Sequence, residues 1–208
     1  LPNANGRRVL HYQVGVFNGQ GINMKDVDNR KDVIGGIWLM PISGMRIGAF
    51  GWTGSYARTG TWTENGETIS GTRTVSRNRY AISGEYVKDD WTFRSEYIHS
   101  QGYGFKTTYQ KDGQQKDCTL NTNAGDKADG LYALVIAPVQ KNKIHLKARY
   151  DMYRPSAEWS SAKTQYEIGA DYCFGKNVKL NAEYVFVNDR KLAKSNYNML
   201  DFQVDIRF

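Results

Sequence analysis

Apolar and polar residues alternate with a period of two along most of the chain. In the clearest run, residues 178–186, Val, Leu, Ala, Tyr and Phe occupy every second position and Lys, Asn and Glu stand between them. Such alternation predicts β-strands with one apolar and one polar face. The same pattern recurs, sometimes over fewer residues, at 10–16, 80–86, 91–97, 144–152, 166–174 and 200–208. Three further runs with a less certain phase, 31–42, 46–58 and 128–140, bring the expected number of strands to about ten.

The connections between these strands differ in length in a regular way. Short turns strictly alternate with longer polar links, which is the layout of an outer-membrane barrel with tight periplasmic turns and long external loops. In this arrangement both ends of the chain fall on the periplasmic side, and the number of strands is even. The short turns are expected at 43–45, 88–90, 140–143 and 175–177, and the long links at 20–31, 59–76, 101–127, 154–163 and 188–196.

Composition supports strands and excludes a membrane-spanning helix. Mean hydropathy is −0.63, and no stretch approaches the roughly 18 consecutive apolar residues of such a helix, whereas a spanning strand needs only about 9–11 residues. The chain has 14 Tyr, 8 Phe and 5 Trp. Tyr86 and Trp91 flank one short turn, and Tyr172 and Phe174 precede another, where an interfacial aromatic girdle would lie. A membrane barrel is therefore favoured over a soluble β domain.

Net charge and the rare reactive side chains narrow the chemistry. The formal charge is +7, but no Lys/Arg run exceeds two residues, so no nucleic-acid partner is predicted. Cys118 falls in a long link and Cys173 near the periplasmic end of a strand, which argues against an internal disulfide. The three histidines, His11, His99 and His145, fall on separate strands without a second ligand at useful spacing, so no metal site and no cofactor are predicted.

One segment carries a family resemblance. Residues 12–23 spell YQVGVFNGQGIN, and they are followed by Asp28-Asn29, Lys31-Asp32-Val33 and, after a short turn, Arg46-Ile47-Gly48. This segment resembles the phosphate- and polyphosphate-selective porin family, and the match is specific over roughly residues 10–60. The resemblance implies a sixteen-stranded barrel, a homotrimer, and selectivity for anions such as phosphate through arginine side chains.

The chain supplies fewer strands than that family has. We interpret residues 1–208 as a single transmembrane antiparallel β-barrel domain that is incomplete on its N-terminal side, with the first six or so strands and the constriction loop outside this sequence. A complete ten-stranded barrel is the alternative. The chain starts at Leu1 without a Met or a signal sequence, so either a leader was removed or the start of the protein is missing.

The C-terminal end resembles an assembly signal. A final Phe preceded by apolar residues at alternate positions is similar to the signal by which the barrel-assembly machinery recognises outer-membrane proteins. This resemblance implies a bacterial outer-membrane localisation, with membrane lipid and the assembly machinery as partners. The residues that fit the signal are Phe202, Val204, Ile206 and Phe208.

Charged strand residues are expected to face the lumen, because a charge near the bilayer midplane costs about 2–4 kcal/mol on the lipid face. The basic and acidic sets nearly balance, and an ion pair within the wall is the alternative to an anion-binding role for each basic residue. The expected anion path is Arg73, Arg77, Arg79, Arg94, Lys147, Arg149 and Lys179, with Arg207 also basic and Arg46 and Arg58 less certain. The expected acids are Glu85, Glu96, Asp151, Glu167, Asp171, Glu183, Asp201 and Asp205.

These residues favour a passive porin over two other classes. A barrel enzyme would need a nucleophile or an activated water beside a His and a carboxylate. The one candidate, His99 with Ser100, has a phase that points His99 toward lipid, so no enzyme activity is predicted. A non-conducting barrel that anchors surface partners remains the alternative. Trp62 and Trp159 are expected in external loops, where they order neighbouring loops or meet a partner.

Overall fold

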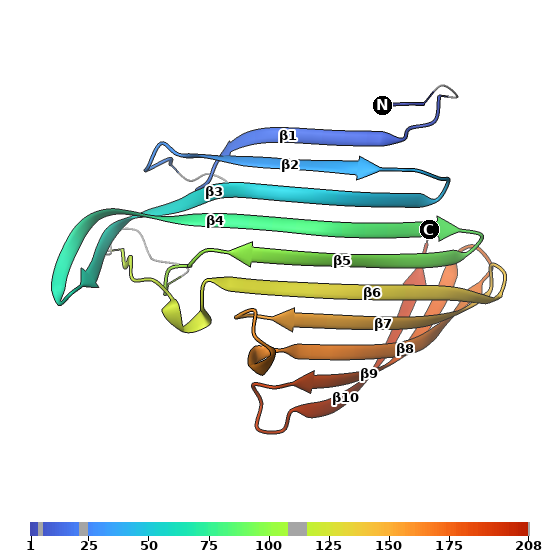
Figure 1. Ribbon diagram of the computed structural model, residues 1–208. Coiled ribbons are helices and arrows are strands. Elements are labelled where there is room, and N and C mark those ends of the chain that lie inside the picture. The colour runs from blue at the N-terminus through green and yellow to red at the C-terminus, as the bar shows by residue number, and fades with distance from the viewer. Residues whose placement is uncertain (4–5, 21–24, 108–115, 208) are drawn as a thin grey trace.

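The computed structural model describes residues 1–3, 6–20, 25–107 and 116–207. Ten strands form one antiparallel sheet in which each strand pairs with the next along the chain (Figure 1). The predicted all-β fold and number of strands are therefore confirmed. The strands are β1 (Leu10–Asn18), β2 (Lys31–Leu39), β3 (Met45–Glu64), β4 (Glu67–Lys88), β5 (Trp91–Gln101), β6 (Lys127–Gln140), β7 (Ile144–Arg154), β8 (Lys163–Phe174), β9 (Val178–Asp189) and β10 (Asn196–Ile206).

The register of the pairs gives the sheet two chemically distinct faces. Tyr166 of β8 lies opposite Phe186 of β9, and Ile168 lies opposite Tyr184, so apolar side chains meet across neighbouring strands. This face is exposed along its length, with Ile168 65% and Phe202 78% accessible. Apolar side chains in such number are stable on an outer surface only when that surface meets lipid. We call this the outer face, and the opposite, charged face the inner face.

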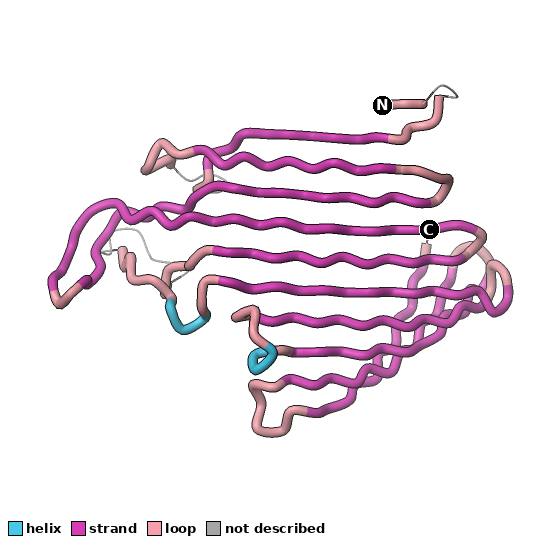
Figure 2. The backbone as a smooth tube through the Cα atoms, in the orientation of Figure 1, coloured by secondary structure: helices cyan, strands magenta, loops and turns pink. Residues whose placement is uncertain are grey.

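The sheet is curved, and the last strands, β9 and β10, bend back behind the middle strands (Figures 1 and 2). Among the described residues, β1 and β10 are not paired by backbone hydrogen bonds. The four short turns lie at one end of the sheet together with both chain termini, and the long connections lie at the other end (Figure 1). The prediction that the short turns and both termini share one end of the sheet is confirmed.

Helical structure is confined to two single 3-10 turns, η1 (Thr122–Ala124) and η2 (Trp159–Ser161), in the described part of the chain. No helix that the structure describes is long and apolar enough to cross a membrane.

The expected loop at 59–76 is wrong. β3 and β4 continue through it as a long hairpin, paired from Met45↔Tyr86 to Glu64↔Glu67. Asn65 and Gly66 both adopt positive φ, 52° and 84°, which is the backbone of a tight two-residue hairpin turn. This segment lies beyond the part of the sheet whose outer face is apolar, so it is polar on both faces. A segment of that composition has the sequence pattern of a loop. Trp62 accordingly lies in β3 and not in a loop.

The β5–β6 connection covers the inner face of this hairpin. A small core forms from Val75 of β4 with Phe105 and Cys118 of the connection, and Tyr56, Trp62 and Leu120 pack around it. Backbone hydrogen bonds reinforce the contact, since the Thr61 N–H donates to the Lys116 carbonyl over 2.9 Å and the Cys118 N–H to the Thr61 carbonyl over 2.8 Å. The connection is therefore held against the hairpin by both packing and strand-like pairing.

The β1–β2 connection covers the opposite face of the hairpin. The hydroxyls of Ser55 and Thr74 donate to the Asp28 carboxylate over 3.3 and 3.2 Å. The Ala57 N–H donates to Gln20 Oε1 over 3.3 Å. The hairpin is thus clamped between two connections, which gives the long-loop end of the sheet a fixed shape.

This packing predicts that Cys118 is protected from thiol reagents. Its side chain is inaccessible, and burial raises the pKa of the thiol, so reactive thiolate is scarce. A Cβ at Gly60 would collide with the Lys116 carbonyl, whereas one at Gly104 would meet open space. Gly60→Ala is therefore expected to raise the labelling rate of Cys118 at least several-fold, measured in a Cys173→Ser background. Equal rates in Gly60→Ala and Gly104→Ala would contradict the packing.

Candidate functional site: the charged inner face

Register brings the charged strand residues to one face of the sheet. Arg46 pairs with Glu85, and Glu85 pairs with Arg94, so three charged side chains form a row across β3, β4 and β5. Arg149 of β7 pairs with Glu167 of β8 in the same way. All the expected basic and acidic lumen residues share this parity, so they belong to the inner face.

Five arginines of β3 and β4 stack on aromatic rings along the inner face. We call this set, Arg46, Arg58, Arg73, Arg77 and Arg79, the arginine–aromatic track. Stacking on an aromatic face stabilises a guanidinium without neutralising its charge. The ring partners, with the distance from guanidinium carbon to ring centroid, are Trp38 for Arg46 (5.0 Å), Phe105 for Arg58 (4.6 Å), Trp62 for Arg73 (5.1 Å), Tyr56 for Arg77 (4.4 Å) and Trp52 for Arg79 (4.4 Å).

The five arginines differ in what else they bind. Arg58 Nη1 donates to the Thr107 carbonyl over 2.8 Å, and Arg73 Nη1 donates to the Cys118 carbonyl over 3.1 Å. These two therefore hold the β5–β6 connection. Arg46, Arg77 and Arg79 make no hydrogen bond or ion pair with any residue that the structure describes. Their N–H groups therefore have no acceptor among the described residues.

A buried carboxylate lies beside this track. Asp32 of β2 is 1% exposed and accepts hydrogen bonds from Trp52 Nε1 at 2.7 Å and from the Ser55 N–H at 2.8 Å. It occupies the space over Gly54, where any Cβ would collide with its carboxylate. Gly54 also pairs with Arg77, so Asp32 and Arg77 lie on either side of this glycine. Asp32 orients the Trp52 indole, and the indole in turn supports Arg79.

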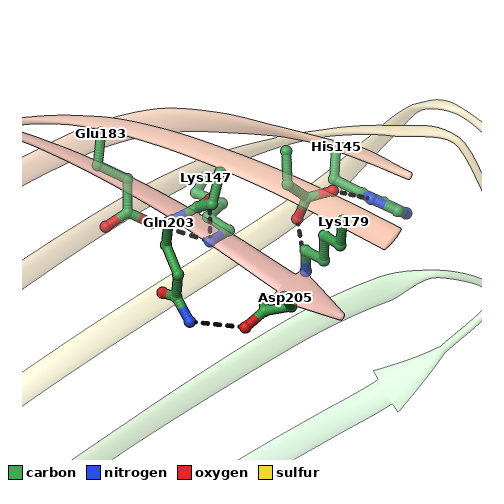
Figure 3. Close-up of polar contacts among 8 residues, drawn as sticks. His145, Lys147, Lys179, Glu183, Gln203 and Asp205 are labelled. Atoms are coloured by element: carbon green, nitrogen blue, oxygen red, sulfur yellow. Dashed lines mark hydrogen bonds and ion pairs between the residues drawn. The ribbon is translucent and has the colours of Figure 1, made fainter. Parts of the chain in front are cut away.

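Several basic residues elsewhere on the inner face are paired with carboxylates, whereas Arg207 has no ion-pair partner among the described residues. Four of the seven residues expected in the anion path form ion pairs within the wall, the alternative to an anion-binding role. Figure 3 shows part of this network, with side chains of β7, β9 and β10 projecting toward the pale green strands. The pairs are Arg94–Glu85 (2.6 Å), Lys147–Glu183 (2.8 Å), Arg149–Asp151 (2.7 Å) and Lys179–Asp171 (2.9 Å).

Other carboxylates of this region make no direct ion pair with a described residue. Glu167 and Asp201 have neither a hydrogen bond nor an ion pair with any described residue. Asp205 accepts a 2.7 Å hydrogen bond from Gln203 (Figure 3). The strands from β7 to β10 are therefore balanced or acidic on the inner face, while β3 and β4 are basic there.

The structure also shows where His99 and the residues of the expected assembly signal lie. His99 stacks on Tyr80 with 5.1 Å between ring centroids, on the outer face where its phase put it. Among the residues of the expected assembly signal, Phe202, Val204 and Ile206 are exposed on the outer face of β10, and Phe208 lies outside the described residues.

Sequence reasoning missed the aromatic partners of the arginines. Trp38 and Trp52 lie in the runs 31–42 and 46–58, whose phase the alternation left ambiguous, so the sequence assigned them to neither face. For Trp52 the available signal was its parity with Arg46, because a residue six positions away on the same strand shares its face, whereas Trp38 of β2 is placed on that face only by the register with β3.

Comparisons with known proteins support the fold. No protein-family profile and no curated protein matches the chain. Among solved structures, OmpT, an outer membrane protein of Vibrio cholerae, is similar with a TM-score of 0.51 and 16% identity, over 87% of this chain and 51% of that protein. Its loop L8 deletion mutant gives a TM-score of 0.51 and 16% identity, over 94% of this chain and 59% of that one. The chain thus spans between half and three-fifths of these structures, which share its outer-membrane barrel fold and agree with the expected outer-membrane localisation.

The hydrogen bond from Trp52 to Asp32 is expected to contribute to the free energy of unfolding. Trp52→Phe keeps an aromatic ring under Arg79 but removes the only side-chain donor to the buried Asp32 carboxylate among the described residues. Loss of a donor to a buried charged acceptor costs about 1–3 kcal/mol. We expect a decrease of that size in the free energy of unfolding, measured by urea denaturation in lipid vesicles. Trp91→Phe, at an exposed outer-face position, is the control, and an equal loss in both variants would contradict the assignment.

Proposed function

We propose that the chain forms the wall of a water-filled outer-membrane diffusion pore that prefers anions. The observation that carries the proposal is the pair Arg77 and Arg79, which lie side by side on β4 without a carboxylate partner within ion-pair distance among the described residues. Charged side chains that line an aqueous path set the ion preference of that path.

The geometry suits transient anion binding. The aromatic ring under each guanidinium supports it without accepting its hydrogen bonds, so the N–H groups can still donate to an anion. An arginine already tied to a carboxylate would have to exchange that partner, which applies to Arg94 with Glu85. Unpaired arginines attract anions without this exchange, and small oxyanions such as phosphate can accept forked hydrogen bonds from them.

The location of the track supports passage along one side of the lumen. The track follows β3 and β4, whereas the uncompensated carboxylates Glu167 and Asp201 belong to β8 and β10. The potential is therefore expected to be positive along the first wall and negative along the second. The resemblance of residues 10–60 to phosphate-selective porins favours phosphate as a solute, and it favours a homotrimer, which crosslinking in membranes would test.

Selectivity measurements on variants test the proposal. In planar bilayers with a KCl gradient, the double variant Arg77→Ala/Arg79→Ala should lower the chloride-to-potassium permeability ratio roughly threefold to tenfold, because a local potential of one to a few kT sets the ion concentration. The double variant Arg94→Gln/Glu85→Gln removes a compensated pair and should change the ratio much less.

Three results would count against the proposal. Equal effects of the two double variants would remove the special role of the track. A cation preference in the unmodified protein would mean that the carboxylates of β8 and β10, and not the arginines of the track, set the ion preference of the pore. An absence of conductance from correctly folded protein would favour the non-conducting anchor barrel.

A further inference from the structure

Three potential metal ligands meet on the inner face near the short-turn end of the sheet. His145 lies on β7, and Asp171 and Cys173 lie on β8. One donor atom from each residue, a ring nitrogen, a carboxylate oxygen and the thiol sulfur, lies within 4.8 Å of the other two. We propose that these three side chains form a binding site for a zinc ion, a site that does not depend on whether the barrel conducts.

The register explains why they meet. His145 is the cross-strand partner of Asp171, and their side chains touch, with His145 Nδ1 2.6 Å from Asp171 Oδ1. Cys173 is two residues further along β8, so its side chain emerges on the same face. The ligands come from two strands and are separated by 26 residues, which is why spacing along the sequence did not reveal them.

The donor set matches zinc. Nitrogen, sulfur and carboxylate oxygen are its protein ligands, at about 2.0–2.3 Å, in a tetrahedron whose vertices are then roughly 3.3–3.8 Å apart. Donor atoms that already lie within 4.8 Å reach that spacing by small side-chain rotations. Asp171 is 2% exposed, so its charge needs a compensating cation. The harder cations calcium and magnesium prefer oxygen-only sites, which disfavours them here.

An open hollow gives the ion a route and a fourth ligand. A space of about 440 Å³ adjoins the site, with His145, Cys173 and Lys179 in its lining. Water from this hollow can occupy the fourth position of the tetrahedron, as it does in zinc sites with three protein ligands. The site is therefore accessible from the aqueous side of the sheet.

Lys179 holds the place of the cation when no metal is bound. Its ammonium lies 2.9 Å from Asp171 Oδ2, a contact drawn as a dashed line at Lys179 in Figure 3. The Lys179 side chain is 36% exposed and lines the hollow, so it can rotate into that space. Zinc must displace this ammonium, and Arg207 also lines the hollow and adds repulsion, partly offset by Asp205. Binding as a thiolate ligand also releases the Cys173 thiol proton to solvent.

Cobalt and zinc titration of the full chain, folded in detergent, tests the site. Co²⁺ should produce the near-ultraviolet thiolate-to-metal absorption band, and Zn²⁺ should abolish that band by displacement. Cys173→Ser should eliminate the band, and His145→Gln should weaken Zn²⁺ binding at least about tenfold, since even supporting groups of metal ligands contribute tenfold or more. Lys179→Met should strengthen binding, because it removes the competing charge.

Matched controls separate the site from adventitious binding. Cys118→Ser alters the other cysteine, which is buried at the opposite end of the sheet, and His99→Gln alters a histidine of the outer face; both should leave the band and the affinity unchanged. No thiolate band in the unmodified protein, or a band that persists in Cys173→Ser, would overturn the proposal. If the Cys173 or His145 variant fails to fold, the Lys179→Met result decides, and unchanged or weaker zinc binding there would also overturn it.

Discussion

The constraint on which this structure depends is that lipid offers no hydrogen bonds to a peptide backbone. Every N–H and C=O group inside the hydrocarbon must pair within the sheet, which requires long strands joined to their neighbours along the chain. Because side chains alternate between the two faces of a strand, giving one face to lipid confines charged residues within the hydrocarbon to the other. The crowding of arginines, lysines and carboxylates on the inner face thus follows from the fold, before any function is considered.

Function depends on how those charges are compensated. On β7–β10 and at Arg94, bases meet carboxylates and their charge is largely cancelled. On β3 and β4 the arginines rest on aromatic rings, and Arg77 and Arg79 keep their charge. Asp32, buried against Trp52, fixes one of these rings and is accommodated only because Gly54 has no side chain. The same face can therefore present a basic path on one wall and a balanced or acidic surface on the other.

Sequence alone predicted the strands, the phase of seven of them and the grouping of the short turns at one end, because a period of two with one lipid face leaves little freedom. The phase of 31–42, 46–58 and 128–140 required the register of the sheet. Sequence alone failed at 59–76, where a strand that leaves the membrane loses its apolar face and looks like a loop. It could not predict partners, because pairing depends on register. Lys147 reaches Glu183 two strands away, and His145 meets Asp171 and Cys173, although these residues are far apart along the chain. The arginine residues were predicted, but the distinction between free and paired arginines required the structure.

The central claim is that the face bearing the track meets water and the opposite face meets lipid. A nitroxide scan of residues 79–84 on β4, in lipid vesicles, tests it most directly, because this strand carries Arg79 on one face and Tyr80 and Ile82 on the other. The account predicts collisions with a water-soluble nickel complex at 79, 81 and 83, and with dissolved oxygen at 80, 82 and 84, in strict alternation. Collision rates without alternation, or with the opposite phase, would contradict it.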